Sequence, residues 1–217
     1  VLIPVYCSEN TLKKCLWSVF KQNFKCFEIV VVNDGSLGNL CKKIVNQIRK
    51  NGNNYRHSIG LPQVELKYIE HSKNMGLVET RRTAFLSSIG KWITCLDSDD
   101  EMHENALTSY YKYTSDYDII QGATECGVFT EQESFLIEKD VSNWRNHKVY
   151  FGSLEGHDIF HKWFVNVNYD GVLWNKLVKR ELYEFAFENI PFCECNFGED
   201  VLIYFFLSIK AKSYFGM

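Results

Sequence analysis

The 217-residue sequence has no excess of basic charge, no long apolar run and no internal repeat. Its formal net charge is −3, and basic residues gather only in pairs such as Lys42 with Lys43. A nucleic-acid-binding domain needs a basic patch, so this charge argues against nucleic acid as the main partner. The longest apolar run, 201–207, is far shorter than the roughly 20 residues of a membrane-spanning helix. We expect no transmembrane segment and no signal peptide, and peripheral membrane association stays open.

Paired cysteines are also scarce. Of the eight cysteines, only Cys193 and Cys195 lie close together, and one Cys-x-Cys pair is a weak zinc signal. Cys15 and Cys95 fall inside apolar patterns, where a reduced cysteine packs as a small hydrophobe. We therefore expect free thiols and a cytoplasmic location. A position at the inner face of the membrane is compatible with this. The chain begins inside a predicted strand, so we also expect it to be truncated at one or both ends.

What the sequence does contain is a regular alternation of strand and helix patterns. Short apolar runs predict strands at 1–5, 28–32, 64–68, 92–96 and 117–120. Apolar residues at i, i+3, i+4 and i+7 predict helices at 12–20, 41–48, 77–89, 174–183 and 200–210. We expect a polar loop over 51–62, and Gly90 at a helix C-cap. The pattern predicts an α/β fold: a Rossmann-like, doubly wound, mostly parallel sheet with helices on both faces.

Hydrophobic residues make up 46% of the sequence, enough to bury a substantial core. The length suits one large domain or two closely joined halves. The regular pattern ends near residue 121, and beyond residue 126 it loosens. We expect residues 1–121 to form one half and 122–217 to form a second half of the same domain.

The acidic segment that follows the strand at 92–96 is the most informative part of the chain. Asp97 and Asp99 are two residues apart, so in an extended chain they point the same way. Asp100 adds a third carboxylate at this strand end, where open α/β sheets bind ligands. Converging carboxylates are tolerated when a cation lies between them, and oxygen ligands suit Mn²⁺ or Mg²⁺. We interpret the segment as a metal–diphosphate site.

The same segment has simpler interpretations. It is also compatible with a solvated turn that caps a helix beginning near Glu104. An EF-hand loop fits poorly, because Met102 stands where the glycine belongs and Thr108 where the bidentate glutamate belongs.

Polar residues follow two other predicted strands, at 6–10 and 33–36, and suit the binding of a nucleotide. The ordered set of motifs resembles the family 2 glycosyltransferases, inverting enzymes with the GT-A fold. The resemblance rests on residues 3–6, 29–36, 74–76 with Arg81, 90–100, 174–177 and 198–200. Each motif alone is weak, and their order along nearly the whole chain makes the set specific.

The resemblance implies a role for each matched residue. Pro4 and Tyr6 would lie near the nucleoside, and Glu9 near its base or ribose. Asp34 would accept a hydrogen bond from uracil, whose N3–H needs an acceptor. Asp97 would contact the ribose or diphosphate.

Asp99 would bind the metal ion that bridges the two phosphates, and Asp200 would be the general base that deprotonates the acceptor hydroxyl. Arg81 would belong to the nucleotide-binding set. Here Arg82, Thr83 and Ala84 follow it, whereas the family often has Asn and Gly.

Four further residues in or beside these motifs are candidate contacts of the donor or acceptor: Asp100, Trp174, Lys176 and Glu199. The implied enzyme is an inverting, metal-dependent hexosyl- or N-acetylhexosaminyltransferase. Its donor would be a nucleotide-sugar, with a UDP-sugar favoured. Its acceptor would be a glycan or lipid-linked sugar, as in surface polysaccharide biosynthesis.

Simpler interpretations of single motifs stay open. Asp34 with Gly35 and Ser36 is an ordinary turn sequence, and Glu199 with Asp200 could cap a helix. His157 and His161 are spaced to share one helical face, but a third metal ligand is not evident. Trp174 and nearby aromatic residues are more often core residues than sugar platforms.

Two alternatives to a glycosyltransferase also remain. A nucleotidyltransferase that makes a nucleotide-sugar would need a glycine-rich basic loop after the first strand. Residues 6–10 contain no glycine and one acid. A catalytically silent binding module with the same fold would not need Asp97, Asp99 and Asp200.

Overall fold

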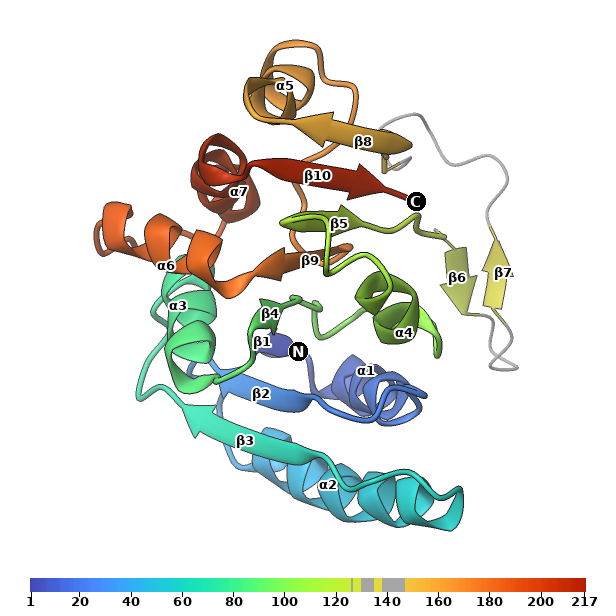
Figure 1. Ribbon diagram of the computed structural model, residues 1–217. Helices are drawn as coiled ribbons and strands as arrows, with labels where there is room; N and C mark the ends of the chain where they lie inside the picture. The colour runs from blue at the N-terminus through green and yellow to red at the C-terminus, as the bar shows by residue number, and fades with distance from the viewer. Residues whose placement is uncertain (126, 130–134, 138–146) are drawn as a thin grey trace.

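Two sheets that meet edge to edge, with β1 of one beside β4 of the other, form the centre of the fold (Figure 1). The structure is a computed structural model, and it describes residues 1–125, 127–129, 135–137 and 147–217. The first sheet is parallel and consists of β1 (Leu2–Val5), β2 (Glu28–Asn33) and β3 (Glu65–Glu70). An isolated parallel bridge between Leu2 and Cys95 joins it to the second sheet. There Leu2 N donates to Thr94 O at 2.9 Å, and Leu96 N donates to Leu2 O at 2.9 Å.

The second sheet is mixed, with the strand order β4-β9-β5-β10-β8. Its strands are β4 (Trp92–Ile93), β9 (Lys176–Lys179), β5 (Ile119–Gln121), β10 (Ser213–Gly216) and β8 (Gly152–Glu155). β10 runs parallel to β5, whereas β9 is antiparallel to both β4 and β5. β6 (Gly127–Phe129) and β7 (Phe135–Ile137) form a separate antiparallel pair.

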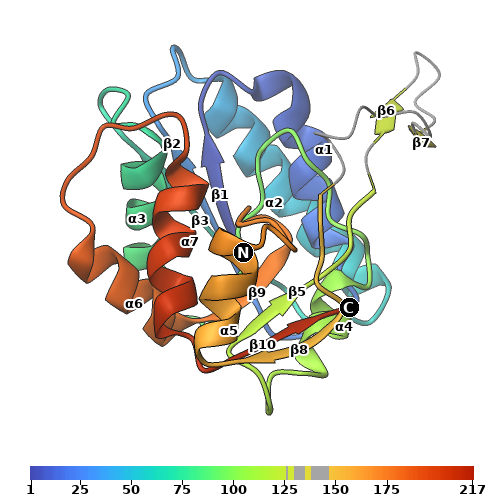
Figure 2. The same ribbon diagram turned by 90° about the horizontal axis from the view of Figure 1, so that it is seen from above.

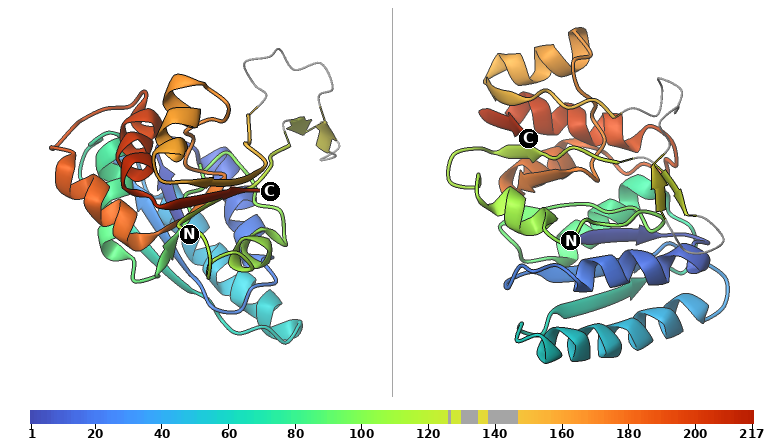
Figure 3. Two further views of the ribbon diagram at one scale, coloured as in Figure 1. Left: turned by 45° about the horizontal axis from the view of Figure 1, so that its top comes forward. Right: turned by 90° about the vertical axis from the view of Figure 1, so that its right-hand side faces the viewer.

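Helices cover both faces of the strands (Figures 2 and 3). α1 (Glu9–Phe20) and α2 (Leu40–Ser58) pack together on one face, beside the short α4 (Ala106–Tyr111). α3 (Leu77–Ser87), α6 (Arg180–Asn189) and α7 (Glu199–Lys210) lie on the other. α5 (His157–Phe160) continues into the π-helical turn η1 (His161–Val165) and packs against α7.

Alternate residues of β1 and β2 belong to two different apolar cores. Leu2, Val30 and Val32 pack with α3, while Ile3 and Val31 pack with α1 and α2. A strand buried on both faces needs apolar residues at every position, which explains the continuous apolar runs in the sequence. The predicted doubly wound α/β fold is confirmed. The division at residue 121 stays a prediction, and β9 of the second half lies between β4 and β5 of the first.

The polar loop predicted over 51–62 is wrong, because α2 continues to Ser58. The reason is Arg56, whose side chain is fully buried under the loop that follows α1. Its guanidinium donates to four main-chain carbonyls, those of Phe20, Gln22, Phe24 and Pro62. These tertiary hydrogen bonds outweigh the weak helix propensity of the glycine and asparagines at 52–54.

The helix predicted over 174–183 is also wrong in its first half, where the chain forms β9 and turns helical only at Arg180. β9 is only four residues long, so its apolar pattern fits either period. The proposed C-cap at Gly90 is not observed, because α3 ends at Ser87. Instead, Gly90 N and Ile89 N donate to the Glu28 carboxylate at 2.9 and 2.6 Å.

Candidate functional site

The carboxyl ends of β1 and β2 and the segment after β4 meet at one edge and enclose a cavity. The cavity has a volume of about 440 Å³, within the usual range of small-molecule sites. Four of the predicted nucleotide-binding residues line it. The lining residues are Pro4, Val5, Tyr6, Asp34, Asn74, Leu77, Thr80, Asp97, Ser98 and Asn196.

Asp34 lines this cavity beside the start of α3, and three hydrogen-bond partners hold its carboxylate in place. Its Oδ1 accepts a hydrogen bond from Met75 N at 2.8 Å and lies 2.7 Å from His71 Nδ1. Its Oδ2 accepts from Gly76 N at 3.0 Å. Each carboxylate oxygen can accept two hydrogen bonds, so Oδ2 retains capacity for a ligand. His71 follows β3 at the same sheet edge and was not among the residues predicted from the sequence.

Gly35 allows the loop after β2 to lie close to the main chain of Lys73 and Asn74. Its φ is +77°, and a Cβ there would lie 2.5 Å from the main-chain carbon of Lys73. Only glycine therefore fits this turn.

The loop after β1 supplies Tyr6, which is 54% exposed and forms part of the cavity wall. Cys7 N donates to Ser36 Oγ at 3.0 Å, which ties this loop to the loop after β2. The Ser8 and Ser98 hydroxyls are 2.6 Å apart and tie it to the acidic segment. Glu9 is the first residue of α1 and is not among the described residues that line the cavity.

Arg81 of α3 lies behind the cavity and joins the acidic segment after β4 to the two acidic residues at the start of α7. It is 1% exposed, and its Nη2 lies 2.9 Å from Asp97 Oδ1, 3.3 Å from Glu199 Oε1 and 3.5 Å from Asp200 Oδ1. Three acidic partners raise the pKa of this guanidinium even though burial opposes its charge. Arg81 thus holds the segment after β4 against the start of α7, and it does not line the cavity itself.

Asp200 sits in an environment suited to proton transfer. Burial raises the pKa of its carboxyl from 3.8 to about 7, with Arg81 opposing the shift and Glu199 and Asp97 adding to it. Among the described residues, its buried Oδ1 has no hydrogen-bond donor, since the Arg81 contact has only ion-pair length. The Asp200 side chain is 21% exposed although Oδ1 is buried, so an acceptor hydroxyl would meet the carboxylate from the side of Oδ2. A carboxylate with a pKa near 7 can take a proton from such a hydroxyl.

The acidic segment fits a hard divalent cation that a diphosphate would share. Asp99 is exposed, and burial together with the charges of Asp97 and Asp99 raises the pKa of Asp100 to about 6. Within the described part of the chain, no group of three or more His, Cys, Asp or Glu residues could hold a metal ion. Mg²⁺ typically uses one or two carboxylates and completes its shell with substrate phosphates and water. Asp99, with Asp100 beside it, matches that donor set.

The candidate contacts on β9 and the preceding loop differ in their exposure. Trp174 is partly exposed, and its ring lies edge-on to His147 at 4.5 Å between centroids. Lys176 is fully buried and does not reach the cavity; its Nζ donates to Val172 O at 2.7 Å and to Asn175 Oδ1 at 3.0 Å. His147, whose ring contacts Trp174, was not among the residues predicted from the sequence.

The alternative metal sites find no support among the described residues. His157 and His161 lie with ring centroids 5.7 Å apart, without a third ligand that could complete a metal site there. Cys193 and Cys195 are free thiols, as are the other cysteines that the structure describes; Cys126 lies outside those residues. The described helices include none long and apolar enough to cross a membrane.

Comparison with known proteins identifies the family. The sequence profile described as glycosyl transferase family 2 matches residues 1–165. The chain belongs to this family. It is 30% identical over 207 residues to glycosyltransferase GlyA of Streptococcus pneumoniae, which covers 92% of this chain and 26% of GlyA. It is also 30% identical over 122 residues to the minor teichoic acid biosynthesis protein GgaA of Bacillus subtilis, covering 54% of this chain and 24% of GgaA.

Solved structures confirm the predicted GT-A fold of this family 2 chain. S. aureus TarS 1–349 superimposes over 100% of this chain and 56% of that 1–349 chain, with a TM-score of 0.70 and 20% identity. The complex of TarS 1–349 with UDP-GlcNAc gives a TM-score of 0.70 and 19% identity, over 100% of this chain and 57% of the TarS 1–349 chain. The chain spans about a quarter of the length of GlyA and GgaA.

Proposed function

We propose that this chain is the catalytic domain of an inverting, metal-dependent glycosyltransferase that uses a UDP-sugar. One observation carries the proposal: the buried Arg81 holds Asp97, at the cavity, against Asp200, at the start of α7. A sugar donor in the cavity would therefore lie next to a carboxylate whose pKa is about 7. The TarS complexes with UDP and UDP-GlcNAc support the same donor class for a domain with this fold.

The cavity would bind the nucleotide through residues that follow three different strands, β1, β2 and β4. The ring of Tyr6 and the adjoining Pro4 would pack against the nucleoside, and Asp34 Oδ2 would accept the N3–H of uracil. Glu9 would face the base or ribose from the first turn of α1. Asp97 would face the ribose or diphosphate, while Arg81 would fix the Asp97 carboxylate from behind.

Asp200 would act as the base in the chemical step. An acceptor hydroxyl is a poor nucleophile, so Asp200 would take its proton as the new bond to the anomeric carbon forms. A single base opposite the leaving group gives one displacement and inversion of configuration. Glu199 is held by Arg81 and would orient the acceptor hydroxyl or the loop before α7. Trp174 and Asp100 are candidate contacts of the sugars.

Asp99 would hold Mn²⁺ or Mg²⁺, which would stabilise the negative charge that develops on the leaving diphosphate. The acceptor would be a hydroxyl of a glycan or lipid-linked sugar in surface polysaccharide biosynthesis. The similarity to GgaA, a teichoic acid biosynthesis protein, supports this acceptor class. The free thiols of the described cysteines support a reducing cytoplasmic location, including the inner face of the membrane.

A donor panel tests the proposal. The chain would be mixed with UDP-, GDP- and CDP-sugars in Mn²⁺ or in EDTA, and both thermal stabilisation and slow release of free nucleotide would be measured. We expect stabilisation and release with UDP-sugars in Mn²⁺ only. Stabilisation without release from any donor would indicate a binding module, and pyrophosphate release from UTP with a sugar phosphate would indicate a nucleotidyltransferase.

A further inference from the structure

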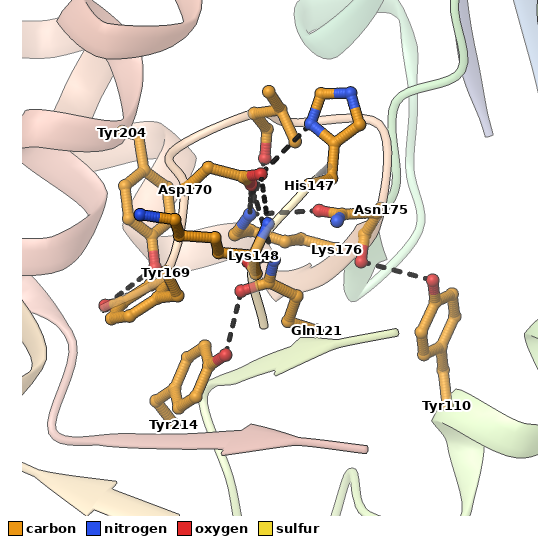
Figure 4. Close-up of polar contacts among 11 residues, drawn as sticks. Tyr110, Gln121, His147, Lys148, Tyr169, Asp170, Asn175, Lys176, Tyr204 and Tyr214 are labelled. Carbon is orange, nitrogen blue, oxygen red and sulfur yellow. Dashed lines mark hydrogen bonds and ion pairs between the residues drawn. The ribbon is translucent and has the colours of Figure 1, made fainter. Parts of the chain in front are cut away.

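A network of polar contacts surrounds Asp170, a partly exposed residue of the loop before β9 (Figure 4). Asp170 Oδ2 accepts a hydrogen bond from Lys148 N at 3.0 Å and lies 3.0 Å from His147 Nδ1. Its Oδ1 lies 3.4 Å from Gln121 Nε2 and 3.7 Å from Lys176 Nζ. Three other segments of the chain, at 147–148, Gln121 and Lys176, therefore fix the position of this carboxylate.

Lys176 is the cation of this network, and its side chain is fully buried. Its Nζ has two neutral acceptors, the Val172 carbonyl and the Asn175 side chain, and Asp170 is its ion-pair partner. Burial lowers the pKa of the Lys176 ammonium to about 8, and Asp170 opposes this shift. Without Asp170, more of the Lys176 side chain would be neutral near physiological pH.

Lys176 packs directly on the helix that carries the proposed base. Its Nζ lies 5.0 Å from the ring centroid of Tyr204, which follows Asp200 by four residues and so shares its face of α7. The Tyr204 hydroxyl lies 3.2 Å from that of Tyr169, whose own hydroxyl donates to Ile159 O at 2.7 Å. The charge of Lys176 lowers the pKa of Asp200, as does that of Arg81.

We propose that Asp170 is a positioning residue for the transfer reaction: it keeps Lys176 charged and fixed against α7, and Lys176 in turn keeps Asp200 ionised. The inference rests on the proposed function, in which Asp200 is the base. Asp170 itself does not contact the cavity, so its effect passes through Lys176.

Other charges also face these groups and have to stay constant in a test. Asp200 is faced by Arg81 of α3, Glu199 of its own helix, Asp97 after β4 and Lys176 of β9. The titratable Cys95 after β4 and Tyr183 of α6 also face it. Lys176 is faced by Asp170 and Asp200. The groups facing Asp170 are His147, Lys176, Tyr204 and Tyr214.

The ionisation of Asp200 can be measured without turnover. Each protein is compared with its own Asp200→Asn partner by thermal unfolding from pH 4 to 9.5. The pKa of Asp200 is raised to about 7 in the folded protein. Asp200→Asn should therefore stabilise the fold by an amount that grows from about pH 4 and levels off near pH 7. We expect Asp170→Asn, in 150 mM salt, to move this levelling-off point upward by roughly 0.5–1 pH unit.

A double-mutant cycle tests whether Asp170 acts through Lys176. Lys176→Met should show a similar upward shift, and Asp170→Asn should add nothing in the Lys176→Met background. The matched control is Asp118→Asn. Asp118 pairs at 2.5 Å with Lys179, which lies in β9 like Lys176, and it lies away from the site. It should lower the melting temperature and leave the levelling-off point unchanged.

Activity gives a second readout. Hydrolysis of UDP-GlcNAc in Mn²⁺ should fall roughly 3–10-fold in Asp170→Asn at pH 6.5, with KM nearly unchanged, and recover towards pH 8.5. An unmoved levelling-off point in Asp170→Asn, or a shift that adds to that of Lys176→Met, would overturn the inference. If Asp170→Asn does not fold, an unmoved point in Lys176→Met overturns it equally. Wild-type protein inactive on every UDP-sugar would instead contradict the proposed function, since the unfolding comparison needs no turnover.

Discussion

Asp200 and Glu199 are adjacent at the start of α7, but their carboxylates have different surroundings. Glu199 Oε1 accepts a hydrogen bond from Arg81 at 3.3 Å, whereas Asp200 Oδ1 has no donor among the described residues. We therefore expect Asp200→Asn to lower turnover of a UDP-sugar by roughly 10²–10⁴-fold, the usual contribution of a general base. UDP affinity, measured by calorimetry, should be nearly unchanged, because a base acts only in the chemical step.

Glu199→Gln is the matched variant for this prediction. It keeps the side-chain shape and the oxygen that can accept from Arg81, so its loss of turnover should be much smaller. Near-normal turnover in Asp200→Asn together with an inactive Glu199→Gln would move the role of base to Glu199. If neither substitution affects turnover, the base lies elsewhere.

The raised pKa of Asp200 also has a consequence for stability. In the unfolded chain this carboxyl ionises near 3.8, but in the folded protein only near 7, so the folded state is penalised at every pH above about 4. Asp200→Asn removes this penalty. We expect it to stabilise the fold by about 2–4 kcal/mol at pH 8 and by almost nothing at pH 4.

Thermal or urea unfolding at the two pH values measures this difference. A gain of stability with loss of turnover is typical of residues held in place for catalysis. Equal stability of Asp200→Asn and wild type at pH 8 would show that the folded protein does not disfavour the Asp200 carboxylate.

At the scale of secondary structure, the sequence predicts best those elements whose apolar pattern is set by burial. β1 and β2 are buried on both faces and appear in the sequence as continuous apolar runs, so their positions follow directly. β9 is as short as β1 but has a lysine at each end, so it forms no continuous apolar run and its two apolar residues fit a strand or a helix period. The end of α2 depends on Arg56, whose four carbonyl partners are distant or irregular and leave no pattern in the sequence.

The Arg56 contacts give a prediction about α2. Arg56→Met should destabilise the fold by about 2–4 kcal/mol, because it leaves buried main-chain carbonyls without donors. Lys50→Met, at an exposed position of the same helix, is the control and should change stability by less than about 0.5 kcal/mol. Urea unfolding measures both. A loss in Arg56→Met no larger than in Lys50→Met would show that these contacts do not stabilise the end of α2.

At the scale of the whole molecule, the predicted site residues divide into those that line the cavity and those that do not. Pro4, Tyr6, Asp34 and Asp97 line the cavity, as their places at strand ends suggested. Arg81 and Lys176 are instead buried behind it. The ion pairs of Arg81 join distant segments, and sequence spacing contains no information about such pairs. Lys176 is buried in β9 and pairs with the nearby Asp170, in a stretch of sequence without a regular pattern.

The central claim is that this cavity binds UDP together with a divalent cation held at Asp99. Calorimetric titration of UDP, GDP and CDP into the protein, in Mn²⁺ and in EDTA, tests it most directly. We expect UDP to bind most tightly, to lose at least tenfold in affinity in EDTA, and to bind Asp99→Ala equally weakly in both buffers, with an unchanged melting temperature. Equal UDP affinity in Mn²⁺ and EDTA, or a clear preference for GDP, would contradict the account.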